Sequence, residues 1–290
     1  MNPDDRLWFI KNQIGGVSHL FDIAHYHCET FRLIRESVSR EERTWLIRWM
    51  DDRYITLFHL ALKHAGTFRM LLQSVSSDER LQSLQLYDLS KSKKLFHLAA
   101  ESADTLGMIL QSVSSDERLQ ILQIKDWGGQ TVLYRAACMP VTEGIEMLKM
   151  IMQSIGSDER LQLLQTEDDS GMTLLHHGAC VSASNIVEVI LESVSEEERY
   201  VLLSTHDSCK YTPIQLACFY KPRSLDVMIR LRTEETWYRA LLADDGRGYT
   251  PLHASAYRGQ TKVIKSISNS LSAQHLRRLL RITVRVGHTQ

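Results

Sequence analysis

The sequence predicts an all-α fold, a solenoid of about seven stacked copies of one helical unit, because two blocks of residues recur along its 290 positions. The serine block, read most fully in SVSSDERLQ, begins at Ser37, Ser74, Ser112, Ser154 and Ser193. The threonine block, read in TLFHLA and its variants, begins at His19, Thr56, Lys94, Thr131, Thr173, Thr212 and Thr250. Successive threonine blocks lie 37 to 42 residues apart. Self-similarity at such a period indicates a repeat protein.

The threonine block resembles the ankyrin repeat. TPLHAS at 250–255 is close to that family's T-P-L-H-x-A motif, and a D-x-x-G-x-T run precedes it at 126–131, 168–173 and 245–250. The resemblance implies two antiparallel helices per copy, joined to the next copy by a finger-like turn. It covers nearly the whole chain, so residues 1–290 are predicted to form one array. Each copy exceeds the usual ankyrin length of about 33 residues by roughly four or five.

The serine block accounts for the extra length. Four copies have the S-x-x-E spacing of a capping box, in which the serine oxygen accepts one N–H of the first helical turn and the glutamate accepts another. These pairs are Ser39 with Glu42, Ser76 with Glu79, Ser114 with Glu117, and Ser195 with Glu198. Leucines at i and i+3 follow, as at Leu119 and Leu122, and mark one helical face. We therefore expect a third helix of about two turns in each copy, before the finger turn.

The ends of the chain fall inside a repeat. Arrays need polar capping units at their ends, and neither end has a clear one. Either Trp8, Phe9 and the apolar residues of 276–282 cap the stack, or the array is a piece of a longer protein.

Composition favours a protein that folds in water. The chain is 43% hydrophobic and 24% charged with a formal net charge of −1, and no apolar run approaches the roughly 20 residues of a membrane span. The N-terminus lacks the long apolar stretch of a secretory signal. Five scattered cysteines without a C-x-x-C pair favour free thiols in a reducing compartment. We expect an intracellular, most simply cytoplasmic, protein whose cysteines are structural and unreactive.

Neither catalysis nor a metal or cofactor site is expected. The histidines of the threonine blocks, His59, His97, His176 and His253, are one repeat apart, too far to share an ion with bonds near 2 Å. The ankyrin resemblance implies instead that they form local hydrogen bonds. No G-x-S-x-G, no H-E-x-x-H and no nucleophile–base pair stands out.

The resemblance also places the binding surface. In ankyrin proteins, variable residues of the finger turn and of the end of the first helix line a concave face. At these positions the last copies of this chain are rich in aromatic residues and arginine, which interface hot spots favour. The candidate partner-binding residues are Trp127, Tyr211, Phe219, Tyr220, Arg247, Tyr249, Tyr257 and Arg258. The alternative is that Tyr211 and Phe219 only pack between repeats.

Two functions fit these observations. The first is a monomeric, non-catalytic scaffold or adaptor that binds other proteins through the concave face. The second is an electrostatic tether to a membrane or nucleic acid through segment 262–290, because residues 246–290 hold eight Lys and Arg and no acidic residue. Nucleic acid is not the expected partner, since no aromatic interleaving or base-reading module is present. The simpler interpretation of the basic segment is that Leu276, Leu279 and Leu280 cover the end of the stack.

Overall fold

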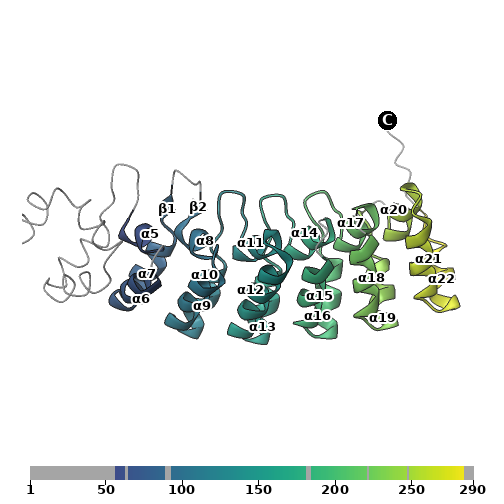
Figure 1. Ribbon diagram of the computed structural model, residues 1–290. Coiled ribbons are helices and arrows are strands. Elements are labelled where there is room, and N and C mark those ends of the chain that lie inside the picture. The colour runs from purple at the N-terminus through teal and green to yellow at the C-terminus, as the bar shows by residue number, and fades with distance from the viewer. Residues whose placement is uncertain are drawn as a thin grey trace, which may run out of the picture. The chain divides into compact units, whose positions relative to one another are not determined.

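The computed structural model describes residues 56–62, 65–88, 93–180, 184–220, 222–246 and 248–283. The chain divides into two compact units, 1–127 and 128–290, and each is considered by itself. The described residues are almost wholly helical (Figure 1), so the expected all-α class is confirmed.

Each described copy contains three helices. The first helix begins one residue after the start of the threonine block: α5 (Leu57–Ala61), α8 (Leu95–Ala99), α11 (Val132–Cys138), α14 (Leu174–Cys180), α17 (Pro213–Tyr220) and α20 (Pro251–Tyr257). The second helix follows after a short turn: α6 (Ala65–Ser74), α9 (Ala103–Ser112), α12 (Val141–Ser154), α15 (Ser184–Glu192), α18 (Pro222–Arg230) and α21 (Thr261–Asn269). The third helix is the added element: α7 (Ser77–Leu84), α10 (Ser115–Leu122), α13 (Ser157–Leu164), α16 (Glu196–Ser204), α19 (Glu234–Leu241) and α22 (Ala273–Leu279).

The capping boxes expected from the serine blocks start three of these third helices. Ser76 caps α7, Ser114 caps α10 and Ser195 caps α16, each with the reciprocal bond to the glutamate three residues later. In α13 the cap residue is Gly156, which has no side chain, yet Glu159 Oε2 still accepts its backbone N–H at 2.8 Å. The box at Ser39, like the copy that begins at His19, lies outside the described residues.

The arginine of the serine block holds neighbouring repeats together, a role that the spacing did not reveal. In α13, Arg160 Nε donates to the carbonyl of Met152 at 2.7 Å, in the second helix of its own repeat. Its Nη1 reaches the carbonyl of Ser193, just past the second helix of the next repeat, at 3.4 Å. Arg199 repeats the pattern with Leu191 and Leu231, at 2.6 and 3.0 Å. One guanidinium therefore satisfies carbonyls at two helix ends, where no intrahelical donor exists.

In the unit 1–127 the same contact joins the two described repeats. Arg80 Nε donates to the carbonyl of Leu72 at 3.1 Å, and its Nη1 donates to the carbonyl of Ser112 at 3.1 Å. The finger turn of this unit holds two short antiparallel strands, β1 (Tyr87–Asp88) and β2 (Lys93–Lys94), with Tyr87 opposite Lys94.

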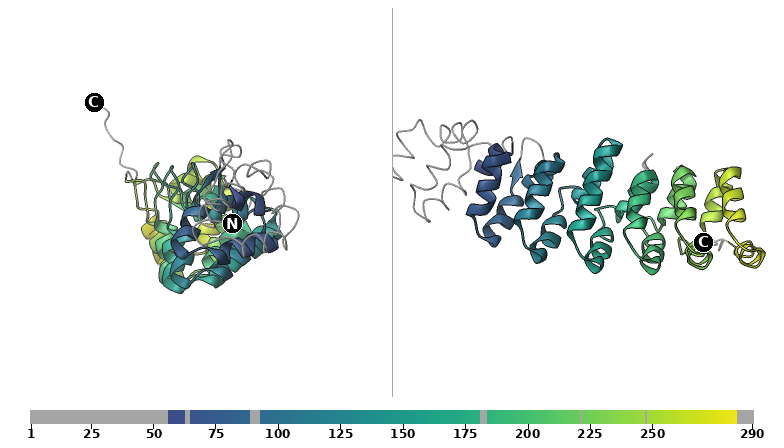
Figure 2. Two further views of the ribbon diagram at one scale, coloured as in Figure 1. Left: turned by 90° about the vertical axis from the view of Figure 1, so that its left-hand side faces the viewer. Right: turned by 60° about the horizontal axis from the view of Figure 1, so that its bottom comes forward.

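In the unit 128–290 four repeats stack in chain order (Figure 1), and the layers follow one another from teal to yellow in the tilted view of Figure 2. First helices contact first helices, α11 with α14, α14 with α17 and α17 with α20. Second helices do the same, α12 with α15, α15 with α18 and α18 with α21. The buried surfaces are aliphatic, including Leu175, Val187 and Ile214. Because equal elements stack on each other, equal positions of successive repeats line the same face.

The cysteines differ in part from the expectation that they are structural. The four described cysteines are free, and only Cys218 among them is fully buried. Burial raises the pKa of the Cys218 thiol to about 12, which fits an unreactive side chain. Cys138 and Cys209 are exposed instead, because their positions fall at the end of a first helix and in a finger turn. Cys28 lies outside the described residues.

Candidate functional site

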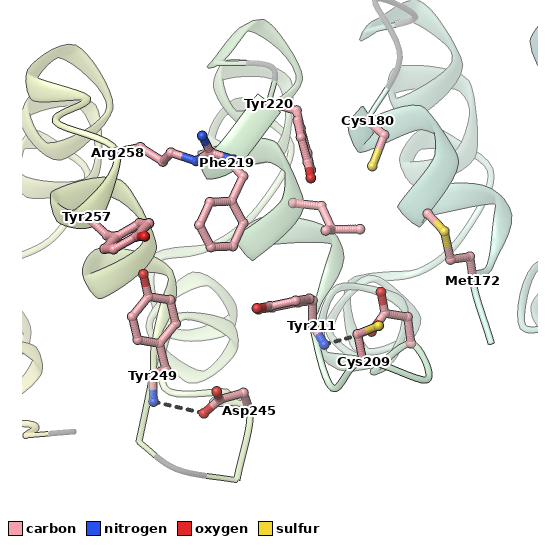
Figure 3. Close-up of a pocket in the computed structure, with 12 residues that line it drawn as sticks. Met172, Cys180, Cys209, Tyr211, Phe219, Tyr220, Asp245, Tyr249, Tyr257 and Arg258 are labelled. Carbon is pink, nitrogen blue, oxygen red and sulfur yellow. Dashed lines mark hydrogen bonds between the residues drawn. The ribbon is translucent and has the colours of Figure 1, made fainter. Parts of the chain in front are cut away.

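The unit 128–290 contains a pocket of about 830 Å³ at the finger turns and first-helix ends of its last three repeats (Figure 3). We call it the aromatic pocket. Its lining residues come from the turns before α14, α17 and α20 and from those helices: Met172, Cys180, Asp207, Cys209, Tyr211, Leu216, Phe219, Tyr220, Asp245, Tyr249, Tyr257 and Arg258. Nine of these twelve residues stand at the variable positions of the repeat, and the exceptions are Asp207, Asp245 and Leu216.

Hydrogen bonds between repeats fix the backbone of two pocket tyrosines. His176 Nε2 lies 3.1 Å from the carbonyl oxygen of Tyr211 in the next repeat. Gln215, which replaces the histidine in the following copy, donates from Nε2 to the carbonyl of Tyr249. Tyr211 and Tyr249 each stand directly before the threonine of their block. Each is held by the side chain that stands three residues after the threonine of the preceding block, His176 or Gln215.

The same tyrosines are held a second time through their amides. The N–H of Tyr211 donates to Asp207 Oδ1 at 2.8 Å. The N–H of Tyr249 donates to Asp245 Oδ1 at 3.2 Å (Figure 3). Both aspartates stand five residues before a threonine. Tyr211 and Tyr249 thus have both backbone polar groups satisfied, and their rings are carried by a rigid turn.

The rings form a connected cluster around Phe219. Tyr211 meets Phe219 edge to face, with centroids 5.5 Å apart and planes at 82°. Tyr249 is stacked on Phe219 at 6.3 Å, and Tyr220 lies 6.2 Å away at a tilt. Tyr211, Phe219 and Tyr249 are half-buried, whereas Tyr220 is 55% exposed and Tyr257 is 79% exposed. Tyr220 and Tyr257 therefore remain available to a partner, and Tyr220 rests on the ring of Phe219.

Charges of both signs line the pocket. The Arg258 guanidinium lies over the rings of Phe219 and Tyr220, 5.4 and 5.9 Å from their centroids, within the range of cation–π attraction. Asp207 is only 8% exposed and Asp245 is half-buried. Burial raises the pKa of the Tyr249 hydroxyl, with the neighbouring Tyr211 as the next cause, so this hydroxyl stays protonated at neutral pH. Burial, followed by the charge of Asp207, also raises the pKa of Cys180.

The structure brings together six of the eight candidate binding residues, Tyr211, Phe219, Tyr220, Tyr249, Tyr257 and Arg258. Trp127 belongs to the other unit, where it is 71% exposed in a finger turn with its ring 5.1 Å from that of Tyr87. Arg247 lies outside the described residues. Phe219 packs against Tyr249 of the next repeat, Tyr211 packs against Phe219 of its own repeat, and both line the pocket, so packing and pocket lining are compatible.

Sequence reasoning missed the acidic lining of the pocket. Asp245 begins a D-x-x-G-x-T run, which indicates a turn and no binding role, and Asp207 holds the same position in DSCKYT, where lysine replaces the glycine. The sequence does contain a signal that distinguishes these aspartates, the residue four places after each threonine. In one copy this residue is His177, which bonds to Asp168 of its own turn. In the next two copies it is Leu216 and Ala254, which have no polar group to bond to Asp207 and Asp245.

The histidines of the threonine blocks form the local bonds implied by the resemblance. Nδ1 of His59, His176 and His253 lies 2.9, 2.8 and 2.8 Å from the hydroxyl of Thr56, Thr173 and Thr250 respectively. Lys94 takes the threonine position before His97 and has no hydroxyl to offer. Over the ranges that the structure describes, no group of three or more His, Cys, Asp or Glu side chains is placed to hold a metal ion. Within those ranges, no helix combines the length and hydrophobicity of a membrane span.

Comparisons with known proteins concern the fold alone. No protein-family model matches the chain, and a search of curated proteins finds no relative. Among solved structures 69 chains match. One is an ankyrin repeat domain from Acinetobacter baumannii AYE, which is 12% identical over 87% of this chain and 96% of that chain, with a TM-score of 0.45. The repeat architecture stated above rests on the helices and their recurring hydrogen bonds.

Proposed function

We propose that the protein is a non-catalytic scaffold or adaptor that binds partner proteins through the aromatic pocket. The observation that carries the proposal is that exposed Tyr220 and Tyr257 line one pocket with a cluster of packed rings, to which Tyr220 also belongs. Exposed aromatic residues in a preformed hollow are the usual anchors of protein interfaces, because they bury a large area and keep a polar group. A protein of this kind would act as a monomer inside the cell, where the free cysteines stay reduced.

The rigidity of the pocket supports this function. Association costs free energy for every side chain and loop that must be ordered. Here Tyr211 and Tyr249 are held through both backbone groups, so their turns have little freedom left to lose. A partner that buries Tyr220 and Tyr257 would then gain contact area without ordering the surface first.

The test is a capture experiment from lysate with the wild type and the double variant Tyr220→Ala/Tyr257→Ala. Both side chains are exposed, so the variant should fold like the wild type, as circular dichroism and thermal unfolding would verify. A matched control is Tyr238→Ala, which makes the same chemical change outside the pocket, on α19. We expect partners bound by the wild type and the control to be lost by the double variant. Equal capture by all three proteins would contradict the proposal.

The electrostatic tether is the second candidate, and one observation favours it. Lys262, Lys265, Arg277, Arg278 and Arg281 are all exposed. Of the three leucines expected to cover the end of the stack, Leu279 is buried and Leu276 is half-buried, as a cap would require, whereas Leu280 is 63% exposed. Washing the captured proteins at low and at physiological salt separates the two functions, since contacts between exposed charges are screened within about 10 Å at 0.1 M salt and aromatic contacts are not. Partners lost to salt from wild type and double variant alike would favour the tether.

A further inference from the structure

One buried carboxylate in the aromatic pocket has an oxygen that no described residue satisfies. Asp207 Oδ1 accepts the N–H of Tyr211 at 2.8 Å, whereas Oδ2 has no hydrogen-bond donor among the residues that the structure describes. Asp207 is 8% exposed and lines the pocket. This oxygen is not one of the fully buried atoms, so it faces solvent and can accept a donor that enters the pocket.

The preceding repeat shows how the chain satisfies this carboxylate elsewhere. Asp168, at the equivalent position, uses both oxygens: Oδ1 accepts the N–H groups of Ser170 and Met172 at 2.9 Å, and Oδ2 lies 2.8 Å from His177 Nε2. His177 stands four residues after its threonine, where the next repeat has Leu216. The leucine leaves Asp207 Oδ2 without the nitrogen donor that its counterpart has.

The surroundings of Asp207 suit a positively charged donor. Tyr211, Phe219 and Tyr220 line the same pocket, and the Tyr211 and Phe219 planes meet at 82°, forming a corner of two aromatic surfaces. Aromatic faces attract cations, most strongly where water is partly excluded. Arg258 demonstrates this attraction within the chain, because its guanidinium lies over Phe219 and Tyr220.

We propose that the aromatic pocket binds a cationic side chain, lysine or arginine, of a partner peptide, whose N–H donates to Asp207 Oδ2 while its charge lies against the rings. The inference rests on the proposed function and names the chemistry of the partner. The ligand would take the place that His177 holds beside Asp168. Among the described residues of the lining, two carboxylates and one guanidinium give a net negative charge, which complements such a ligand.

Arg258 makes the sign of the ligand's charge testable. It is the cationic side chain among the pocket residues, so it repels an incoming cation and attracts an anion. Replacing it with glutamine removes the charge and leaves a shorter polar side chain. If the ligand is cationic, Arg258→Gln strengthens binding, and if the ligand is acidic, the same change weakens it.

The experiment is an NMR titration of the full chain with N-acetyl amides of arginine, lysine, norleucine and glutamate. The Tyr211 amide reports on the site, because it is bonded to Asp207, and the Ser170 amide, bonded to Asp168 outside the pocket lining, is the internal control. We expect arginine or lysine amide to shift the Tyr211 signal in the millimolar range without moving that of Ser170. Norleucine amide, of similar length but uncharged, should bind at least tenfold more weakly, and glutamate amide should not bind.

Two variants complete the test. Asp207→Asn keeps an acceptor for the Tyr211 amide and removes the charge, and we expect it to weaken binding about tenfold. Asp168→Asn is the matched control and should change nothing. Arg258→Gln should strengthen binding several-fold. Tighter binding of glutamate or norleucine amide, or an Asp207→Asn variant that binds arginine and lysine as the wild type does, would overturn the inference. Partner capture sensitive to Tyr220→Ala/Tyr257→Ala would still stand in that case, so the two proposals can fail separately.

Discussion

His176 connects two repeats through one neutral imidazole. Its Nδ1 accepts the N–H of Thr173 at 3.1 Å, so the proton belongs on Nε2, which donates to the carbonyl of Tyr211. Burial lowers the pKa of His176 to about 4, because the charged form would lose its hydration. Gln215 forms the same two bonds in the next copy without a titratable group. The chain thus contains a natural substitute for this histidine.

We predict that His176→Gln reduces the acid sensitivity of the fold. The folded-state pKa lies below the ordinary 6.5, so the unfolded chain takes up the proton first as the pH falls. The stabilisation by neutral His176 is complete above about pH 6.5 and is lost as the pH falls toward 4. Between pH 7.5 and 5 the free energy of unfolding of the wild type should fall by about 2 kcal/mol more than that of the variant. Urea unfolding at the two pH values measures this difference, and equal losses would contradict the prediction.

The finger turns depend on one residue with a left-handed backbone, two places before the threonine. Gly171 has φ +71° there, and Lys210 has φ 68° at the same position of the next repeat. A side chain costs roughly 1 kcal/mol in this conformation. Gly171 also lies against the neighbouring turn, since a Cβ at this position would come within 2.7 Å of the Ser208 nitrogen. That nitrogen donates to the carbonyl of Ser170 at 3.1 Å and links the two turns.

Substitutions at these two equivalent positions should therefore act in opposite directions. Gly171→Ala adds both the backbone strain and the contact with Ser208, and we expect it to lower the free energy of unfolding by about 2–3 kcal/mol. Lys210→Gly relieves the strain at an exposed position and should raise stability by up to about 1 kcal/mol, less the entropy that glycine loses on folding. Thermal unfolding of both variants provides the measurement. An unchanged unfolding temperature for Gly171→Ala would contradict the prediction and show that the turn can accommodate a Cβ.

At the scale of elements, the third helix explains the long repeat. Its capping box starts the helix locally, whereas its arginine contacts carbonyls of two second helices. In the repeat of α19 the equivalent position is Trp237, whose Nε1 donates to Ser270 Oγ at 2.8 Å. Arg232 supplies the missing guanidinium from before the helix and donates to the carbonyl of Ser270 at 3.1 Å. The contact between repeats is therefore kept although the residue that makes it changes.

Removal of one such arginine should destabilise the stack. Arg160 donates to the carbonyls of Met152, Ile155 and Ser193, and methionine retains its apolar volume without any donor. We predict that Arg160→Met lowers the free energy of unfolding by about 2 kcal/mol, less than a fully buried site would lose because water can reach part of the guanidinium. Arg223→Met replaces an exposed arginine on α18 and serves as the control. It should lower the free energy of unfolding by less than about 0.5 kcal/mol. Equal unfolding midpoints for the two variants would refute the role of Arg160.

At the scale of the whole molecule, charge is divided along the chain. Residues 1–245 hold 26 basic and 35 acidic residues, and residues 246–290 hold eight basic and none acidic. Such asymmetry governs association with charged surfaces and does not determine the fold. The aromatic pocket lies where the two regions meet, since Asp207 and Asp245 belong to the first and Arg258 to the second.

We predict that the basic segment and the pocket act independently. Arg277→Gln/Arg278→Gln/Arg281→Gln removes three exposed charges from the last repeat. This variant should capture every partner that Tyr220→Ala/Tyr257→Ala loses, and should differ from the wild type only in salt-sensitive binding to vesicles containing phosphatidylserine. Loss of the same partners by both variants would tie the basic segment to the pocket.

The sequence by itself determined the repeat, its three helices, most of its capping boxes and six residues of the pocket. These features depend on periodicity and on contacts a few residues apart, which a single chain displays directly. Only the tertiary structure revealed the pairing of Arg160 with Ser193, the bond of His176 to Tyr211 and the place of Arg258 over Phe219. These contacts join residues about 30 to 40 positions apart. Their partners are fixed by how one repeat is stacked and rotated on the next, and no local pattern encodes that rotation.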